Sequence, residues 1–574
     1  MPWSIDVTDK SIVLSCLLYT CYLNQESNGC NCIGASLFGE LRFQTIMERS
    51  NMAPRGMVVT PHHLATQSAL NVLKEGGTAI DAAVAAAATL AVVYPHMNSI
   101  GGDGFWLIIP PNAEPFVIEA CGAAGRLAKK DFYKDYAEIP QRGPKSAATV
   151  AGTVGGWHEA LHYVTESGYR NFSRSKLLAD AIYYAEHGFP ISTSLAIFLK
   201  DFYETESPSN EFLEIFAPNG EILKVGDKLY QHKLAKTLKT LAEEGFNSFY
   251  DGKLAEQIAE DMEILGMPIT LEDLNTYAAV RKEPLRLQHS FGEILNVPPP
   301  TQGVVSLGIL GILDQLRIKG DHEGTFIHAA VEATKQGFLL RDEHITDPLY
   351  MEVDANFLLS PENIIRMAKN VDAHQSATIT KCKGPGDTVW LGVMDNKGYS
   401  VSFIQSVYHD FGSGVILPRS GILWHNRGVA FSLKKDHILS LKPGKKPFHT
   451  LNPAAAVLND GRVMIYGTRG GDGQPQTQAA VFHRYVVQDL NLQKAVSAPR
   501  WLYGETLTKG VDTLKLEDRF DKNTVEYLKE RGHKVEILEQ FSEKMGQAGA
   551  LVRHTNAVME GAFDPRGDGS AAGF

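Results

Sequence analysis

The stretch that decides how we interpret this chain is Gly384-Pro385-Gly386-Asp387-Thr388-Val389-Trp390-Leu391-Gly392-Val393. Two glycines and a proline let the backbone bend just before Thr388, and the residues after it are typical of a β-strand. A buried threonine at the start of a strand is the ordinary interpretation. The chemical alternative is that Thr388 attacks the carbonyl before it, cuts the bond to Asp387 and becomes a new N-terminal residue. Its freed amine, with an ordinary pKa of about 7.7–8.0, would then be the base for its own hydroxyl.

Apolar residues alternate beyond Thr388 on both sides of a turn at residues 395–398. Leu391 and Val393 precede this turn, and Val401 and Phe403 follow it. A period of two about an Asp-Asn-Lys-Gly turn predicts a β-hairpin with Thr388 near one end.

Helical and strand patterns follow one another through the rest of the chain. Residues 81–93 are so rich in alanine that we predict a closely packed helix. Further helices are predicted at residues 176–186, 233–244, 326–341 and 476–489, and further strands at residues 57–60, 463–466 and 550–552. Periodicity alone therefore indicates an α+β or α/β fold.

A second glycine-rich stretch offers a partner for the nucleophile. Gly470 and Gly471 lie within Tyr466-Gly467-Thr468-Arg469-Gly470-Gly471-Asp472-Gly473-Gln474. Their N–H groups, with no side chain beside them, could point at a developing oxyanion. A glycine pair by itself is more often a turn than a catalytic site.

Together with Leu451-Asn452-Pro453 and Asp564-Pro565-Arg566, these features resemble the γ-glutamyltranspeptidase family of N-terminal-nucleophile hydrolases. The resemblance runs from about Met57 to the C-terminus. Further motifs occur in the family's order: Thr78-Ala79-Ile80-Asp81-Ala82-Ala83-Val84, Ser99-Ile100-Gly101-Gly102-Asp103-Gly104-Phe105, Gly152-Thr153-Val154-Gly155-Gly156 and Pro298-Pro299-Pro300-Thr301-Gln302-Gly303. No single motif is specific, but their shared order is.

The resemblance implies a four-layer αββα sandwich, in the α/β (α+β) class, formed jointly by two chains cut from one precursor. Residues 47–387 would be the large (α) subunit, and residues 388–574 the small (β) subunit that begins with the nucleophile. Residues 1–46 are a poorly interpretable N-terminal extension, with Met47 or Met57 as alternative starts.

The resemblance also implies the reaction centre. Thr388 matches the nucleophile, Ser406 the hydroxyl that hydrogen-bonds it, and Gly470 with Gly471 the oxyanion hole. Attack on an amide would form an acyl-enzyme, which water or an amine then resolves.

Several positions that grip a glutamyl group in transpeptidases are changed in this chain. The family's asparagine and glutamine contacts fall on Tyr408 and Arg427, its paired serines on His449 and Thr450, and its ammonium-binding acid on Ala430. No arginine stands at residues 119–121, near which the family's carboxylate-binding arginine falls.

These changes predict a substrate that lacks an ammonium group and whose carboxylate is held by Arg427. A buried ammonium without an acidic partner is costly, and arginine grips carboxylates with a two-pronged fork. In this respect the chain resembles the oxamate amidohydrolase branch, which hydrolyses oxamate to oxalate and ammonia and would place it in purine or allantoin nitrogen catabolism. We expect Tyr408, Asn426, Arg427, His449 and Thr450 to bind the substrate. A surface ion pair is the alternative for Arg427.

Three other functions stay open. A γ-glutamyltransferase or glutathione hydrolase with an altered pocket is one, an acylase of the same family is another, and an inactive binding or scaffold protein is the third. The segment 431–447 is shorter than the family's lid-bearing stretch, which favours water as the acceptor.

Composition limits the partners. The formal charge of −11 and the lack of a long Lys/Arg run argue against nucleic acid. The apolar run at residues 11–23 is far shorter than the roughly 18–20 residues that span a bilayer, so we expect no membrane segment. The acidic residues before it favour a cytoplasmic protein, with a secreted or periplasmic one as the alternative.

Cysteine usage predicts neither a disulfide-built body nor a metal site. Four of the six cysteines lie in the first 32 residues, and only Cys121 and Cys382 lie in the remainder of the chain. We expect no metal and no cofactor. The expected partners are a small-molecule substrate and the two subunits of the precursor, and a homo-oligomer of processed heterodimers is compatible with the sequence.

Overall fold

A computed structural model describes residues 49–169, 172–319, 322–378, 387–504 and 512–574 of the 574-residue chain. The chain divides into two units, Met1–Arg49 and Ser50–Phe574, and the description below concerns the second. The predicted N-terminal extension, residues 1–46, and the glycines before Asp387 lie outside the described residues.

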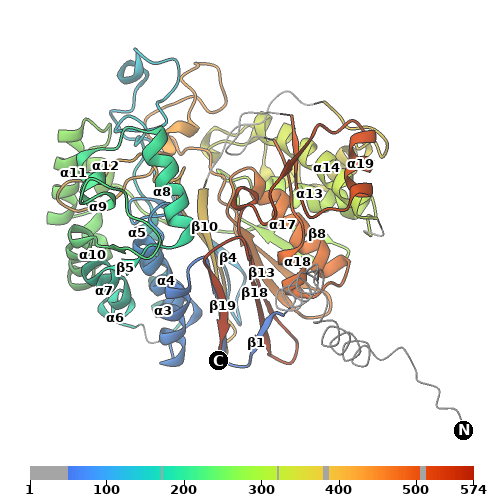
Figure 1. Cartoon of the computed structure of the whole chain (residues 1–574), viewed down its shortest axis with the longest axis horizontal. Coiled ribbons are helices and arrows are strands. Elements are labelled where there is room, and N and C mark those ends of the chain that lie inside the picture. The colour runs from blue at the N-terminus through green and yellow to red at the C-terminus, as the bar shows by residue number, and fades with distance from the viewer. Residues whose placement is uncertain (1–48, 170–171, 320–321, 379–386, 505–511) are drawn as a thin grey trace, which may run out of the picture. The chain divides into compact units, whose positions relative to one another are not determined.

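Two seven-stranded sheets form the centre of the Ser50–Phe574 unit (Figure 1). The first sheet has the strand order β1 (Asn51–Ala53), β18 (Met559–Phe563), β17 (Ala548–Arg553), β13 (Val463–Thr468), β12 (Ala454–Leu458), β9 (Gly292–Asn296) and β8 (Leu285–His289). The second has the order β19 (Ser570–Gly573), β2 (Gly56–Thr60), β10 (Asp387–Asp395), β11 (Ser400–Tyr408), β3 (Asp103–Ile109), β4 (Phe116–Ala120) and β7 (Val280–Lys282). Neighbouring strands in both sheets are antiparallel.

Each sheet combines strands from both sides of Thr388. In the second sheet, β10 pairs with β2, and β11 pairs with β3. In the first sheet, β12 pairs with β9, and β18 pairs with β1. The parts of the chain before and after the predicted cut therefore share main-chain hydrogen bonds in both sheets.

Helices cover the outer face of each sheet (Figure 1). Those on the second sheet's side are α3 (His63–Lys74), α4 (Ala79–Val93), α5 (Thr153–Glu166), α6 (Arg174–Leu177), α7 (Ala179–His187), α8 (Thr193–Thr205), α9 (Asn210–Phe216), α10 (His232–Glu244), α11 (Lys253–Leu265) and α12 (Leu271–Asn275). Those on the first sheet's side are α13 (Gly303–Gln315), α14 (Glu323–His344), α15 (Ala355–Leu358), α16 (Pro361–Lys369), α17 (Gly473–Phe482), α18 (Leu492–Ser497) and α19 (Lys522–Glu530).

Smaller elements complete the unit. A three-stranded sheet contains β14 (Trp501–Tyr503), β15 (Leu514–Glu517) and β16 (Val535–Leu538), and a two-stranded sheet contains β5 (Phe189–Pro190) and β6 (Lys228–Leu229). The predicted helix at residues 476–489 is α17 followed by one π-helical turn, His483–Val487.

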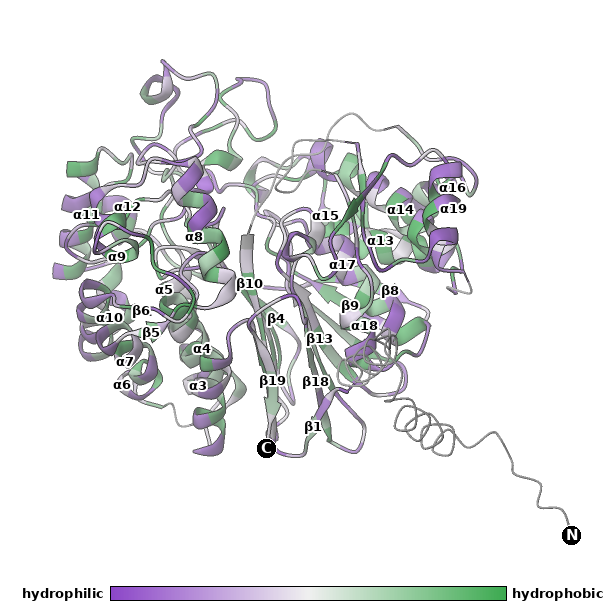
Figure 2. Ribbon diagram, viewed as in Figure 1, coloured by the Kyte–Doolittle hydropathy of each residue, from purple (hydrophilic) through white to green (hydrophobic). Residues whose placement is uncertain are grey.

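Strand β10 shows how the sequence pattern builds the layers. Trp390 and Met394 enter the core between the two sheets, where they meet residues such as Ile465 and Leu551 of the first sheet. Val389, Leu391 and Val393 of β10 face the core under α3 and α4, because successive side chains of a strand point to opposite faces. Apolar residues gather on the strands and on the inner sides of the helices, as Figure 2 shows. This arrangement confirms the predicted αββα sandwich and the predicted hairpin.

The alanine-rich helix is confirmed as α4, and every residue in it is buried. Its start is fixed by a capping box, in which the Thr78 hydroxyl accepts from the N–H of Asp81 and the Asp81 carboxylate accepts from the N–H of Thr78. Small side chains let α4 approach the second sheet on one face and α3 and α7 on others. No helix among the described residues has both the length and the apolar character needed to cross a membrane.

Trp390 sets the spacing between the sheets near Thr388. A Cβ atom added at Gly467 of β13 would lie 2.1 Å from the ring, and one at Gly549 of β17 would lie 2.3 Å from it. The indole N–H donates to the Ser402 hydroxyl at 3.0 Å. The two glycines therefore make the space that the ring occupies.

We expect Gly549→Ala to lower the free energy of unfolding by about 1–3 kcal/mol, because the new methyl group overpacks the core against Trp390. Denaturant titration of the purified protein measures this quantity. Gly308→Ala in α13 is the matched control, since a Cβ there meets nothing within 4 Å and alanine favours the helix. Equal unfolding free energies for the two variants would contradict the packing argument.

Candidate active site

Two strand ends of the second sheet and one of the first meet at the predicted site. Trp390 packs on Gly467 and Gly549, and Gly392 lies against Leu551, so β10 and β17 run in the same direction. Because β13 is antiparallel to β17, its continuation past Gly467 runs toward the start of β10. The topology therefore brings the loop after β13 to the end of the sandwich at which Thr388 lies.

Thr388 is buried, at 1% exposure, beside a break in the strand register. The pairing of β10 with β11 shifts between Asp387 and Val389, which is the local geometry of a β-bulge. The Thr388 hydroxyl donates to the main-chain carbonyl of Gln405 at 2.8 Å. The Ser406 hydroxyl lies on the paired strand and accepts from the N–H of Tyr408 at 2.8 Å. In the uncut chain, the Thr388 hydroxyl therefore bonds to the residue just before Ser406 on the paired strand.

Gly470 and Gly471 lie between β13 and α17 with φ angles of 116° and 49°, a region that favours glycine. Their carbonyls accept from the N–H groups of Gly473 and Gln474. Within the described part of the chain, neither glycine N–H has an acceptor. Two unused N–H groups just before a helix can stabilise an oxyanion.

Arg427, at the start of the 3-10 turn Arg427–Ala430, is 1% exposed. Its guanidinium carbon lies 3.9 Å from the centre of the Tyr408 ring. None of its three side-chain nitrogens has a hydrogen-bond partner among the described residues. Burial lowers its pKa, although Tyr408 and Asp103 partly offset that effect. The alternative of a surface ion pair for Arg427 is therefore wrong.

Tyr408 and Asn426 hold Arg427 in place from two sides. Tyr408 has a φ of +82°, which is unusual for a residue with a side chain and costs about 1–3 kcal/mol. The Asn426 amide accepts from the N–H of His409 at 3.2 Å and donates to the carbonyl of Gln141 at 2.9 Å. Since its amide is engaged by the protein, Asn426 is positioned here to connect the end of β11, after Tyr408, with the turn that begins at Arg427.

Gln302 connects the segment that contains His449 and Thr450 to the loop that contains Gly470 and Gly471. The Gln302 side-chain amide donates to the carbonyls of Thr450 at 3.1 Å and of Gly471 at 2.9 Å. Both ring nitrogens of His449 and the Thr450 hydroxyl are buried and lack hydrogen-bond partners among the described residues. Burial and the nearby Arg427 hold the pKa of His449 well below its usual value, so its ring is neutral.

Sequence reasoning missed Asp103, which stands at the start of β3 opposite Ser406. Its Oδ2 atom is 3.8 Å from Nε2 of His449 and 3.4 Å from Nδ1 of His425. The signal in the sequence was a single acid among the glycines of Gly101-Gly102-Asp103-Gly104. The role of Gln302 was also missed, because its motif does not show that its side chain contacts Thr450 and Gly471.

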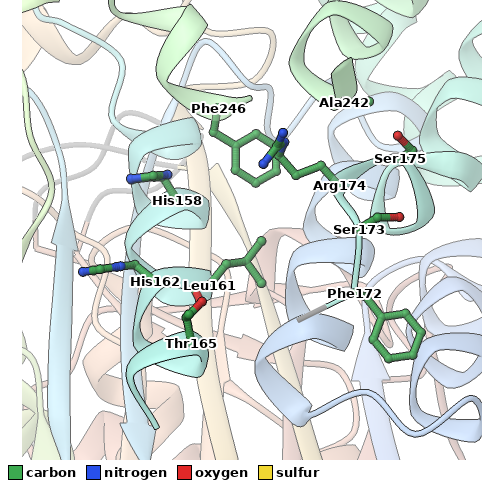
Figure 3. Close-up of a pocket in the computed structure, with 10 residues that line it drawn as sticks. All are labelled: His158, Leu161, His162, Thr165, Phe172, Ser173, Arg174, Ser175, Ala242 and Phe246. Atoms are coloured by element: carbon green, nitrogen blue, oxygen red, sulfur yellow. The ribbon is translucent and has the colours of Figure 1, made fainter. Parts of the chain in front are cut away.

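The cavity in Figure 3 is separate from these residues. It has a volume of about 410 Å³ and is lined by His158, Leu161, His162, Thr165, Phe172, Ser173, Arg174, Ser175, Ala242 and Phe246. These residues come mainly from α5, α6 and the start of the turn after α10. None of them belongs to the predicted site, so we assign the cavity no part in the chemistry.

One buried set of residues has the ligand types of a metal site, but a lysine ammonium already pairs with its carboxylate. His328, Glu332 and His533 offer ligand atoms within 4.8 Å of one another. The Lys335 ammonium lies 2.6 Å from the Glu332 carboxylate, and the two imidazoles share a hydrogen bond of 2.7 Å. Because Lys335 already neutralises the carboxylate of the set, we assign no metal to it.

Comparisons with known proteins agree with this geometry. Residues 65–574 match the Gamma-glutamyltranspeptidase family. The chain is 54% identical over 528 residues to an oxamate amidohydrolase proenzyme of Klebsiella pneumoniae, with 92% of this chain and 100% of that one covered. It is 36% identical over 531 residues to the glutathione hydrolase-like YwrD proenzyme of Bacillus subtilis, with the same coverage.

Among solved structures, a cephalosporin acylase from Bacillus halodurans superposes with a TM-score of 0.84 at 33% identity. That match covers 92% of this chain and 97% of the acylase. With the two-sheet fold, these findings show that the chain belongs to the γ-glutamyltranspeptidase family and is an N-terminal-nucleophile amidohydrolase made as a proenzyme.

Proposed function

We propose that Thr388 is the nucleophile of an amidohydrolase that acts on a small amide bearing a carboxylate, with oxamate as the best candidate substrate. The observation that carries this proposal is the Arg427 guanidinium, which is buried and makes no hydrogen bond or salt bridge among the described residues, although Asp103 acts on it electrostatically. A buried cation of this kind is expensive unless an anion joins it. The 54% identical relative named for oxamate supports the choice of substrate.

The precursor first cuts itself. The Thr388 hydroxyl attacks the carbonyl carbon of Asp387, the C–N bond breaks, and the chain before the cut is left as an ester on Thr388. Water hydrolyses this ester, which leaves a carboxylate on Asp387 and a free amine on Thr388. The cut yields the proposed large subunit, residues 47–387, and small subunit, residues 388–574.

Turnover then reuses the same atoms. The Thr388 amine takes the hydroxyl proton, and the oxygen attacks the amide carbon of oxamate. The N–H groups of Gly470 and Gly471 stabilise the oxyanion while Arg427 holds the neighbouring carboxylate. The amine returns the proton to the leaving nitrogen, ammonia departs, and water converts the remaining acyl ester to oxalate. Tyr408, His449 and Thr450 line this pocket, and Ser406 and Asn426 support its walls.

A second candidate function is favoured by Asp103. An amino acid group carries a carboxylate and an ammonium, and Arg427 with the unpaired Oδ2 of Asp103 offers one partner for each. Hydrolysis or transfer of a γ-glutamyl group, as in the glutathione hydrolase relatives, would use both. An acylase reaction on a group such as glutaryl would use Arg427 alone.

Self-cleavage is tested by the intact mass of the purified protein. We expect the wild type to give two chains, the smaller beginning at Thr388, and Thr388→Ala to stay uncut because it lacks the attacking oxygen. Thr388→Ser is the matched control and keeps self-cleavage, since serine retains the hydroxyl. An uncut wild-type chain would instead support a pseudoenzyme or a scaffold protein.

Arg427→Met tests the carboxylate clamp. We expect self-cleavage to continue and oxamate turnover, measured as ammonia release, to fall by at least about 30-fold, because removing one partner of a buried charge pair typically costs about 2–5 kcal/mol. We also expect the melting temperature to rise, because a buried guanidinium without hydrogen-bond partners is removed. Arg366→Met, at an exposed position of α16, is the control for loss of one charge. Wild-type turnover by Arg427→Met would refute the clamp.

A substrate panel separates the candidate functions. We expect the processed enzyme to hydrolyse oxamate with a higher kcat/KM than glutathione or a glutaryl amide. Release of ammonia, glutamate and glutarate reports on the three reactions. A preference for glutathione would favour the second candidate.

A further inference from the structure

Asp103 is a buried acid next to Arg427 that the mechanism above leaves unused. It is 0% exposed, and its Oδ1 atom accepts from the N–H of Gly152 at 3.1 Å. Its Oδ2 atom has no hydrogen-bond partner among the described residues. One oxygen is therefore held by the protein, and the other is free to receive a proton or an ammonium group.

Among the groups around Asp103, Arg427 is the one whose charge acts on its carboxylate. Arg427 is the cation that acts on it, and His425 and His449 approach its Oδ2 atom with neutral rings. Cys121, Tyr250 and Tyr277 lie near enough to interact with Asp103 electrostatically, and burial raises the pKa of all three above the usual values. Glu119, on the neighbouring strand β4, is already paired with Lys282 and Lys446.

In the uncut chain, Arg427 is therefore the cation that acts on Asp103, and ionised Asp103 balances its charge. Processing adds the Thr388 amine, whose ordinary pKa of about 7.7–8.0 lies in the same range, so the difference between wild type and Asp103→Asn reports on Asp103. Burial raises the pKa of Asp103 to about 7, and Arg427 limits this rise. A substrate carboxylate that binds at Arg427 brings a second negative charge into the same buried space. Two carboxylates that share one cation in a low-dielectric site raise the pKa of one of them.

We propose that Asp103 matches the charge of the pocket to the substrate: it takes up one proton when an anion without an ammonium group binds at Arg427, and it stays ionised when the ligand brings an ammonium group. The inference rests on the proposed role of Arg427. In the first case the proton comes from solvent and neutralises the Asp103 carboxylate, and the bound anion pairs with the guanidinium. In the second case the ammonium pairs with Asp103, and no proton moves. Asp103 is thus a specificity residue that accepts both ligand classes at different pH values.

The sign of the pH dependence follows from this exchange. Binding that takes up a proton is favoured at low pH and weakens once Asp103 is ionised in the free enzyme. An anion such as glycolate should therefore bind about tenfold more weakly at pH 8 than at pH 6. Glycine, which places an ammonium where glycolate has a hydroxyl, should show the opposite preference, because ionised Asp103 is its partner.

Titration calorimetry of the processed wild-type enzyme tests the proposal with these two non-hydrolysable probes. Each titration is repeated in two buffers of different ionisation enthalpy, which gives the number of protons taken up on binding. For glycolate we expect uptake of about 0.9 proton at pH 8 and about 0.1 at pH 6. For glycine we expect none at pH 8. This comparison needs no variant, so it does not depend on how a substitution folds.

Asp103→Asn provides the matched variant, because its side-chain oxygen can still accept from Gly152. We expect its proton uptake on binding glycolate at pH 8 to be about 0.9 proton lower than that of the wild type, and the tenfold weakening that Asp103 causes between pH 6 and pH 8 to be lost. Glycolate binding to the wild type without proton uptake would overturn the role of Asp103 and leave that of Arg427 intact. If neither probe binds, or if Arg427→Met binds glycolate as the wild type does, the clamp itself fails, and this proposal falls with it.

Discussion

The contact of Trp390 with Gly467 and Gly549 is the constraint on which the rest of the site depends. It lets the two sheets approach at one point and aligns the start of β10 with the continuation of β13. Thr388 is two residues from this contact, and Gly470 is three residues from it on the other sheet. The proposed nucleophile and the proposed oxyanion hole, which are distant in the sequence, are therefore held near one another by one ring over two residues that lack side chains.

The site concentrates groups that a stable protein core avoids. Arg427, His449, Thr450 and Gln474 are buried with side-chain polar atoms that find no partner in the described parts of the chain. Tyr408 adds a strained backbone beside them. Each of these features lowers stability, and a small anion bound at Arg427, as we propose, would provide one of the missing partners. The surrounding network, in which Gln302 bonds to two loops and Asn426 to a third, keeps this arrangement from relaxing.

Local patterns predicted the individual helices and strands, and the family resemblance implied their arrangement as a sandwich. The alternation about residues 395–398 gave β10 and β11, and the alanine run gave α4. The sequence also pointed to Arg427 as a substrate-binding residue. It did not show that the side chain is buried, since that depends on packing against Tyr408, which no periodic pattern predicts. The role of Asp103 was missed for a similar reason, because only the pairing of β3 with β11 places it opposite Ser406. The role of Asn426 as a brace depends on Gln141 and His409, which no spacing rule connects to it.

The interleaved strands have a consequence for the processed protein. A cut before Thr388 severs the covalent chain, yet β2 stays between β10 and β19, and β18 stays bonded to β1. Neither product contains a complete sheet, so neither has a fold to return to by itself. We therefore expect the two subunits to stay associated after the cut. Subunits from different processed molecules would not exchange, because exchange would break the main-chain hydrogen bonds of both sheets.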